Sequence, residues 1–154
     1  MMMVEMELVE IQITGELTGP QVIILQEKKG TRNFPIFIGP HEVSVLDQTV
    51  RRVPLSRPLT HELILNVIDG LGGVLTGVVV DELRQETFIG KLLVKTPEGQ
   101  TERIDSRPSD AIILAMKRKV PIYVAEEVLA MTSGDPEDEP DSEDYGADTE
   151  EDDD

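Results

Sequence analysis

Two aspartates that could bind a cation lie five residues apart in the segment Ile104-Asp105-Ser106-Arg107-Pro108-Ser109-Asp110. Pro108 suits the first position of a helix, because its missing N–H is not needed there and its φ is already helical. Asp105 and Asp110 then flank the start of that helix, beside Arg107. Two interpretations remain open. Asp110 caps the helix by accepting a hydrogen bond from the cap N–H, or the aspartates hold a hard cation such as Mg²⁺ or Mn²⁺, which would offset their repulsion.

A second candidate group lies in the segment Arg57-Pro58-Leu59-Thr60-His61-Glu62. Thr60 is a good N-cap for a helix, so His61 falls in the first turn. The positive end of the helix dipole disfavours the imidazolium there, and a neutral His61 can act as a general base. Arg57 and Arg107 are the candidates for stabilising charge on a phosphate. The alternative for His61, and still more for His41, is a first-turn residue that faces solvent.

Several common catalytic motifs are absent from the sequence. It has no glycine-rich phosphate loop, no nucleophile elbow and no His-x-x-x-His zinc pair. It also has no cysteine, which excludes disulfides and thiolate metal sites. We therefore expect no organic cofactor, and Mg²⁺ or Mn²⁺ is the metal that the remaining oxygen ligands favour.

The elements that must position these residues form an α+β pattern. Three strand-like segments followed by a helix occur twice, with the helices beginning at Pro40 and at Pro108. A second helix beginning near Thr60 lies between the two sets. The helix at Pro108 is apolar at every position of residues 111–116, which predicts that it is buried. A further strand at residues 120–124 contains Pro121, which favours a sheet edge or a strand start, and residues 126–129 form a short helix.

The two sets of elements match at a spacing of about 68 residues. Pro40-His41-Glu42-Val43 aligns with Pro108-Ser109-Asp110-Ala111. We therefore predict one compact domain built from a duplicated ββ-β-α unit with a mixed or antiparallel sheet. Phe37 aligns with Asp105, so only the second copy has the extra carboxylate, and we expect that copy to carry the site. The alternative is that any two strand-to-helix junctions look alike.

The formal net charge of −17 is unevenly distributed along the 154 residues. Thirteen of the 31 acidic residues lie after Ala130, where there is no basic residue. Such a composition buries too little apolar surface to fold, so we predict a domain at residues 1–131 and a disordered tail at residues 132–154. The tail either keeps the protein soluble or mimics a nucleic acid and competes for a basic surface.

Basic residues form three short islands, each a weak signal alone because solvated charge runs are common. The islands are Lys28, Lys29 and Arg32; Arg51, Arg52 and Arg57; and Lys117, Arg118 and Lys119. Aromatic residues on which bases could stack are scarce, with no Trp. The sequence has no signal-peptide pattern and no apolar run of membrane-spanning length, so we expect a cytoplasmic protein without a membrane partner.

Three blocks of the sequence together resemble the bifunctional nuclease family. They are residues 34–42, residues 57–63, and residues 104–111 followed by residues 121–129. The resemblance covers Met6 to Leu129 in the family's order and spacing. It implies a compact α+β fold and nuclease activity on both DNA and RNA, and it implies no particular catalytic set.

Two functions of different classes follow. The first is a phosphodiester-cleaving enzyme with nucleic acid as substrate, in which Asp105 and Asp110 bind Mg²⁺ or Mn²⁺. His61 is then the general base, and Arg107 or Arg57 stabilises charge. The second is a non-enzymatic regulatory or assembly module, whose polar blocks cap helices and pair across a homo-oligomer interface. The first function requires Asp105, Asp110 and His61 to converge in one cleft.

Overall fold

Seven strands and four helices make up the residues that the computed structural model describes, 2–13 and 21–132. The strands are β1 (Met3–Gln12), β2 (Gln21–Glu27), β3 (Asn33–Ile38), β4 (Val74–Arg84), β5 (Thr87–Lys95), β6 (Thr101–Ser106) and β7 (Ile122–Ala125). The helices are α1 (Pro40–Val50), α2 (Thr60–Gly70), α3 (Pro108–Arg118) and α4 (Glu126–Thr132). No helix within these described residues is long and apolar enough to span a membrane.

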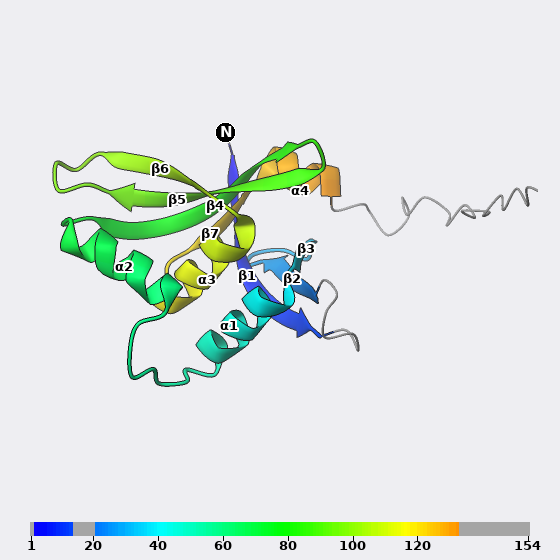
Figure 1. Ribbon diagram of the computed structural model, residues 1–154. Helices are drawn as coiled ribbons and strands as arrows, with labels where there is room; N and C mark the ends of the chain where they lie inside the picture. The colour runs from blue at the N-terminus through cyan, green and yellow to red at the C-terminus, as the bar shows by residue number, and fades with distance from the viewer. Residues whose placement is uncertain (1, 14–20, 133–154) are drawn as a thin grey trace, which may run out of the picture.

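All seven strands form one mixed sheet, in the order β3-β2-β1-β7-β4-β5-β6. Helices α1, α2 and α3 lie on one side of this sheet, and α4 lies on the other (Figure 1). The predicted α+β class and single domain are therefore confirmed. Residues 14–20 lie outside the described residues, and so does the predicted acidic tail apart from Thr132.

The sheet contains two antiparallel meanders, β1-β2-β3 and β4-β5-β6. Each meander is followed by an 11-residue helix that begins at a proline, Pro40 in α1 and Pro108 in α3. β2 and β5 are the middle strands of their meanders, so the two predicted ββ-β-α units occupy equivalent positions in the sheet. The repeat inferred from the sequence is thus present in the topology.

Strand β7 joins the two meanders. It pairs antiparallel with β1 and parallel with β4. The sequence allowed two positions for Pro121, a sheet edge or a strand start. In the structure Pro121 lies at a strand start. Pro121 precedes the first residue of this central strand, and its carbonyl accepts a hydrogen bond from the N–H of Val78 at 3.1 Å. Proline in that place removes no donor from the ladder.

Helix α3 is buried on every side, as its unbroken apolar run predicts. Residues 111–115 are each at most 1% exposed. The helix packs on β4 and β5, with α1 and α2 beside it. The same core includes the largest side chains of the first meander, such as Ile23, Leu25 and Phe34. One core therefore serves both halves, and the start of α3 has a fixed position.

The junction between β6 and α3 depends on Gly90. Residue 90 pairs with Ser106, and a Cβ at Gly90 would lie 3.2 Å from the Ser106 carbonyl oxygen and 3.3 Å from the Pro108 Cα. A glycine within a strand often marks a β-bulge. The register shift lies instead on the partner strand, between Val80 and Glu82 of β4. Gly90 therefore allows the close approach of the chain that leads into α3.

Alanine at Gly90 should destabilise the fold, because two of the three nearest contacts are backbone atoms that cannot move aside. We expect a loss of about 1–3 kcal/mol in the free energy of unfolding, typical of an overpacked site. Gly70, at the end of α2, is the matched control, since a Cβ there meets nothing within 4 Å. Gly70→Ala should stabilise by about 0.4–1 kcal/mol. Urea denaturation measures both variants, and a Gly90→Ala protein as stable as wild type would contradict this account.

Candidate active site at three helix N-termini

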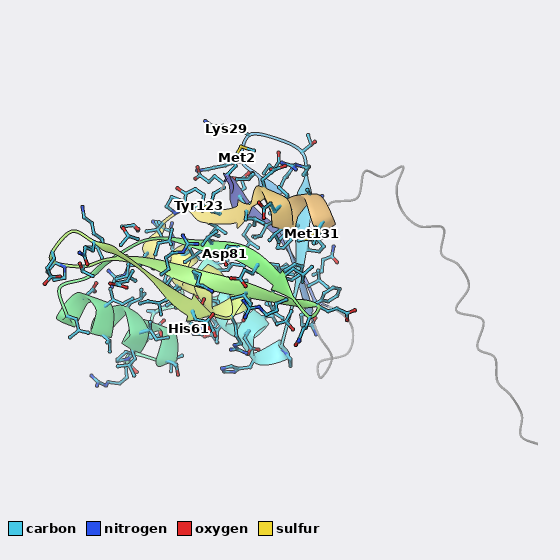
Figure 2. All side chains as sticks on the ribbon, turned by 90° about the horizontal axis from the view of Figure 1, so that it is seen from above. Met2, Lys29, His61, Asp81, Tyr123 and Met131 are labelled. Atoms are coloured by element: carbon cyan, nitrogen blue, oxygen red, sulfur yellow. The ribbon has the colours of Figure 1, made fainter. Side chains whose placement is uncertain are left out.

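His61, Arg107 and Asp110 meet where α2 and α3 begin. The Nε2 atom of His61 lies 2.9 Å from Oδ1 of Asp110, and Nε of Arg107 lies 2.9 Å from Oδ2. His61 is only 8% exposed and lies at the end of α2 nearest α1 (Figure 2). The oxygens of Asp110 bond to the side chains of Arg107 and His61, which corresponds to neither of the two interpretations left open by the sequence, helix capping and a two-aspartate cation site. The N-cap residue of α3 is Arg107, and it has no side-chain cap.

Helix α1 contributes Glu42 to the same cluster. The Nη1 atom of Arg107 donates to Oε1 of Glu42 at 3.0 Å. Arg107 therefore bridges Glu42 and Asp110, each of which lies two residues after the proline that begins its helix. The expectation that the second copy alone carries the site needs correction, because both halves supply an acid. The signal for Glu42 was present in the repeat itself, where it aligns with Asp110.

The first turns of α1, α2 and α3 face one cavity of about 300 Å³. Its walls are formed by residues from all three turns and the apolar side chains beside them: His41, Glu42, Val45, Leu59, Thr60, His61, Ile64, Arg107 and Asp110. None of the three N-cap residues, Gly39, Leu59 and Arg107, forms a side-chain cap. The side chain of Glu62 caps α2, because its Oε2 accepts a hydrogen bond from the N–H of Leu59 at 3.2 Å. The positive dipole ends of three helices nevertheless converge on this cavity and favour an anion here. Thr60, predicted as an N-cap, is the first residue of α2.

The electrostatics of the cluster keep its carboxylates ionised. Burial raises the pKa of Asp110, but the hydrogen bonds from Arg107 and His61 lower it by more than burial raises it. The pKa of Asp110 therefore lies below its usual value. The pKa of Glu42 is lowered chiefly by its own backbone N–H, and Arg107 adds to this effect. An ionised carboxylate only accepts hydrogen bonds, so Nε2 of His61 is the donor to Asp110. A neutral His61 then has its lone pair on Nδ1.

Asp105 does not belong to this cluster. It lies opposite Lys91 in the β5–β6 ladder, with its Oδ1 3.4 Å from Nζ of Lys91, and 82% of its side chain is exposed. Successive residues of a strand point to opposite faces of a sheet. The neighbouring Ser106 is the residue that faces Gly90 and the start of α3, because its Oγ would lie 3.2 Å from a Cβ at Gly90. Asp105 therefore points away from Asp110.

Arg57 and His41 have different positions relative to the cluster. Arg57 lies in the exposed linker between α1 and α2 and forms no ion pair with the described residues. It is not among the residues that line the cavity. His41 is exposed, as expected for a first-turn residue, and its side of α1 borders the cavity. The structure thus brings together His61, Arg107 and Asp110, and it separates Asp105 and Arg57 from them.

The residues present do not form the two-aspartate metal site that the sequence suggested. Asp105 faces the other side of the sheet, and both oxygens of Asp110 accept hydrogen bonds from Arg107. Over the described ranges, 2–13 and 21–132, no group of three or more His, Cys, Asp or Glu residues is arranged to hold a metal ion. A requirement for Mg²⁺ or Mn²⁺ stays a prediction.

Four known proteins match this chain, two from strains of Mycobacterium tuberculosis and two from plants. An uncharacterised protein of Mycobacterium tuberculosis is 36% identical over 125 residues, which cover 79% of this chain and 74% of the relative. Bifunctional nuclease 2 of Oryza sativa subsp. japonica is 30% identical over 107 residues, or 68% of this chain. Bifunctional nuclease 1 of Arabidopsis thaliana is 26% identical over 117 residues, or 75% of this chain. The chain matches only 33% and 36% of the length of these plant proteins.

The fold and the site define an α+β domain of two meander units with a His-Asp-Arg cluster at its convergent helix starts. The family model of the bifunctional nuclease domain matches residues 23–137. The chain belongs to this family, as its resemblance over three sequence blocks implied.

Acidification should weaken the fold in part through Asp110. Its pKa is lower in the folded protein than in the unfolded chain, so the ionised carboxylate stabilises the fold at neutral pH. This contribution is fully present above the unfolded-state value of 3.8 and is lost as the pH falls through the folded-state pKa. Urea unfolding of wild type and Asp110→Asn tests it at about pH 7 and about pH 3. The stability difference between the two proteins should shrink at the lower pH, and an equal difference at both would contradict the charge-based account.

Proposed function

We propose that this protein hydrolyses phosphodiester bonds of DNA and RNA at the cavity between the starts of α1, α2 and α3. The observation that carries the proposal is that His61, held by Asp110 and adjacent to Arg107, lies at a cavity where three helix N-termini favour an anion. A phosphate is the anion that such an arrangement suits. The names of the two plant relatives support the same assignment.

His61 is the general base in this proposal. Asp110 fixes the ring and its tautomer, as the buried aspartate of a Ser-His-Asp triad fixes its histidine. No described residue forms a hydrogen bond with Nδ1, so this atom can accept a proton from water. The water oxygen then forms a bond to phosphorus while the bond to the leaving oxygen breaks, and the leaving oxygen takes a proton from the imidazolium or from solvent. Such proton transfer typically contributes about 10²- to 10⁴-fold in rate.

Arg107 stabilises the charge that develops on the phosphate. Its guanidinium uses one N–H on each of its three nitrogens for Glu42 and Asp110. A guanidinium has five N–H groups, so two remain for phosphate oxygens. The side chain is 64% exposed, which leaves it accessible to a substrate. Arg57, in the exposed linker, stays a candidate only for contacts with phosphates outside the cavity.

Two matched substitutions test the catalytic assignment. Asp110→Asn and Asp105→Asn each remove one negative charge, but only the first disrupts the contact with His61. We expect Asp110→Asn to abolish cleavage and Asp105→Asn to cleave at about the wild-type rate. His61→Ala should slow cleavage by roughly 10²- to 10⁴-fold. The assay follows fluorescent DNA and RNA oligonucleotides with all proteins purified identically.

Equal residual cleavage in wild type, Asp110→Asn and His61→Ala would point to a contaminating nuclease, and the proposal would then fail. The remaining function would be the regulatory or assembly module.

The expected homo-oligomer stays a prediction, as does the cytoplasmic location. Light scattering on the purified protein at several concentrations decides the oligomeric state.

We also propose that cleavage requires Mg²⁺ or Mn²⁺. Phosphate oxygens and water supply most ligands of these ions at nucleic-acid sites, so one protein carboxylate can suffice. Dialysis against EDTA should therefore abolish cleavage, and added Mn²⁺ should restore it. Cleavage that continues unchanged in EDTA would exclude the metal requirement while leaving the assignment of His61 and Asp110 intact.

A further inference from the structure

A larger cavity, of about 480 Å³, adjoins the candidate active site. It lies between the end of α1, the linker of residues 51–59, helix α2 and the end of α3. Val45 and Leu59 line both cavities, so the two are neighbours along the groove between α1 and α2. The linker, which Figure 1 shows looping out between these two helices, forms one side of this larger cavity.

Two of the three basic islands of the sequence meet at this cavity. Arg52 comes from the linker, and Lys117, Arg118 and Lys119 come from the end of α3. Lys117 and Arg118 are ion-paired with acids of α2. Arg52 and Lys119 form no side-chain ion pair with any described residue, so their charges are uncompensated. In a chain with a formal net charge of −17, these two cations form a local site for an anion.

Both cations occupy unusual backbone positions. Arg52 and Lys119 each have a φ of 55°, just past the ends of α1 and α3. Glycine adopts this left-handed conformation at the least cost and is the usual residue at such helix ends. Glycine at these two positions would supply no side chain, whereas Arg52 and Lys119 place two charged side chains at the cavity.

The rest of the cavity combines an apolar surface with two free amides, the hydroxyl of Thr49, and Glu62, whose carboxylate is paired with Lys117. The apolar part comes from Val45, Val53, Leu55, Leu59, Leu65 and Met116. The amides are those of Gln48 and Asn66, and neither side chain is hydrogen-bonded to another described residue. Amide side chains can pair with the polar edges of bases. The ligand that matches this lining has a flat, weakly polar body with hydrogen-bonding edges and a negatively charged group, which describes a nucleotide.

We infer that this cavity binds an unpaired nucleotide adjacent to the phosphodiester at His61, so that the substrate is a single-stranded nucleic acid. The inference rests on the proposed function and specifies its substrate. A base in a duplex is stacked and paired, and it enters a pocket only after the energy of extruding it has been supplied. An unpaired base enters without that cost, while the phosphates beside it reach Arg52 and Lys119.

Binding is measured in the full-length Asp110→Asn protein, so that no cleavage consumes the ligand. The probes are labelled single-stranded and duplex oligonucleotides of one sequence, followed by fluorescence anisotropy over a range of salt concentrations. We expect the single strand to bind more tightly than the duplex. Adding Arg52→Gln and Lys119→Gln should weaken single-strand binding and reduce the slope of log affinity against log salt by about 1.4, or ~0.7 for each phosphate contact.

The matched control adds Arg51→Gln and Lys95→Gln to the same protein. Arg51 precedes Arg52 but pairs with Asp47, and neither Arg51 nor Lys95 lines the cavity. This control removes the same total charge and should bind like the Asp110→Asn parent.

Three results would overturn the inference: no binding of the single strand, duplex binding as tight as single-strand binding, or equal losses in the two double variants. Failure of the nuclease proposal is recognised separately. If the wild-type protein does not cleave but binding still depends on Arg52 and Lys119, the catalytic assignment fails and the nucleotide site stands.

Discussion

The candidate site depends on one constraint: a mostly buried carboxylate must keep its charge. Asp110 has only 26% of its side chain exposed, and it remains ionised because Arg107 and His61 both donate to it. Arg107 extends to Glu42, so the network connects the first turns of α1, α2 and α3. Removing one partner of a buried charge costs more than the pair contributed. The contacts that orient His61 are therefore also contacts that hold three helices together.

The site combines repeated and unrepeated parts of the fold. The two meander units supply equivalent acids, Glu42 and Asp110, which meet on one arginine. His61 comes from α2, which follows the first unit only, since the second unit is followed by β7. The duplicated framework thus provides a pair of acids near an arginine. The added helix α2 provides His61, the proposed general base. The linker that leads into this helix also borders the larger cavity.

Local patterns were enough to predict much of this structure from the sequence. The helix starts at Pro40 and Pro108 and the buried α3 follow from short local patterns, and the repeat follows from comparing two such patterns along the chain. The site was only partly predictable, because Asp110 and His61 are separated by 49 positions and meet through packing of α2 on α3. Asp105 was misplaced because closeness in sequence does not reveal which face of β6 a side chain occupies. The turn at residues 85–86 gave no signal, since Gln and Glu are not the residues that positive φ angles normally select.

The central place of β7 has a consequence for the order of events during synthesis. Residues 122–125 are paired on one side with β1, which begins at Met3, and on the other with β4. Until the ribosome has released them, β1 and β4 each present an open edge that another chain could pair with. The pairing of β7 with β1 spans more than a hundred residues, and such long-range closure is slow. A nascent chain of this domain is therefore exposed to mispairing for most of its translation, and it becomes a single cooperative unit only when one four-residue strand is inserted.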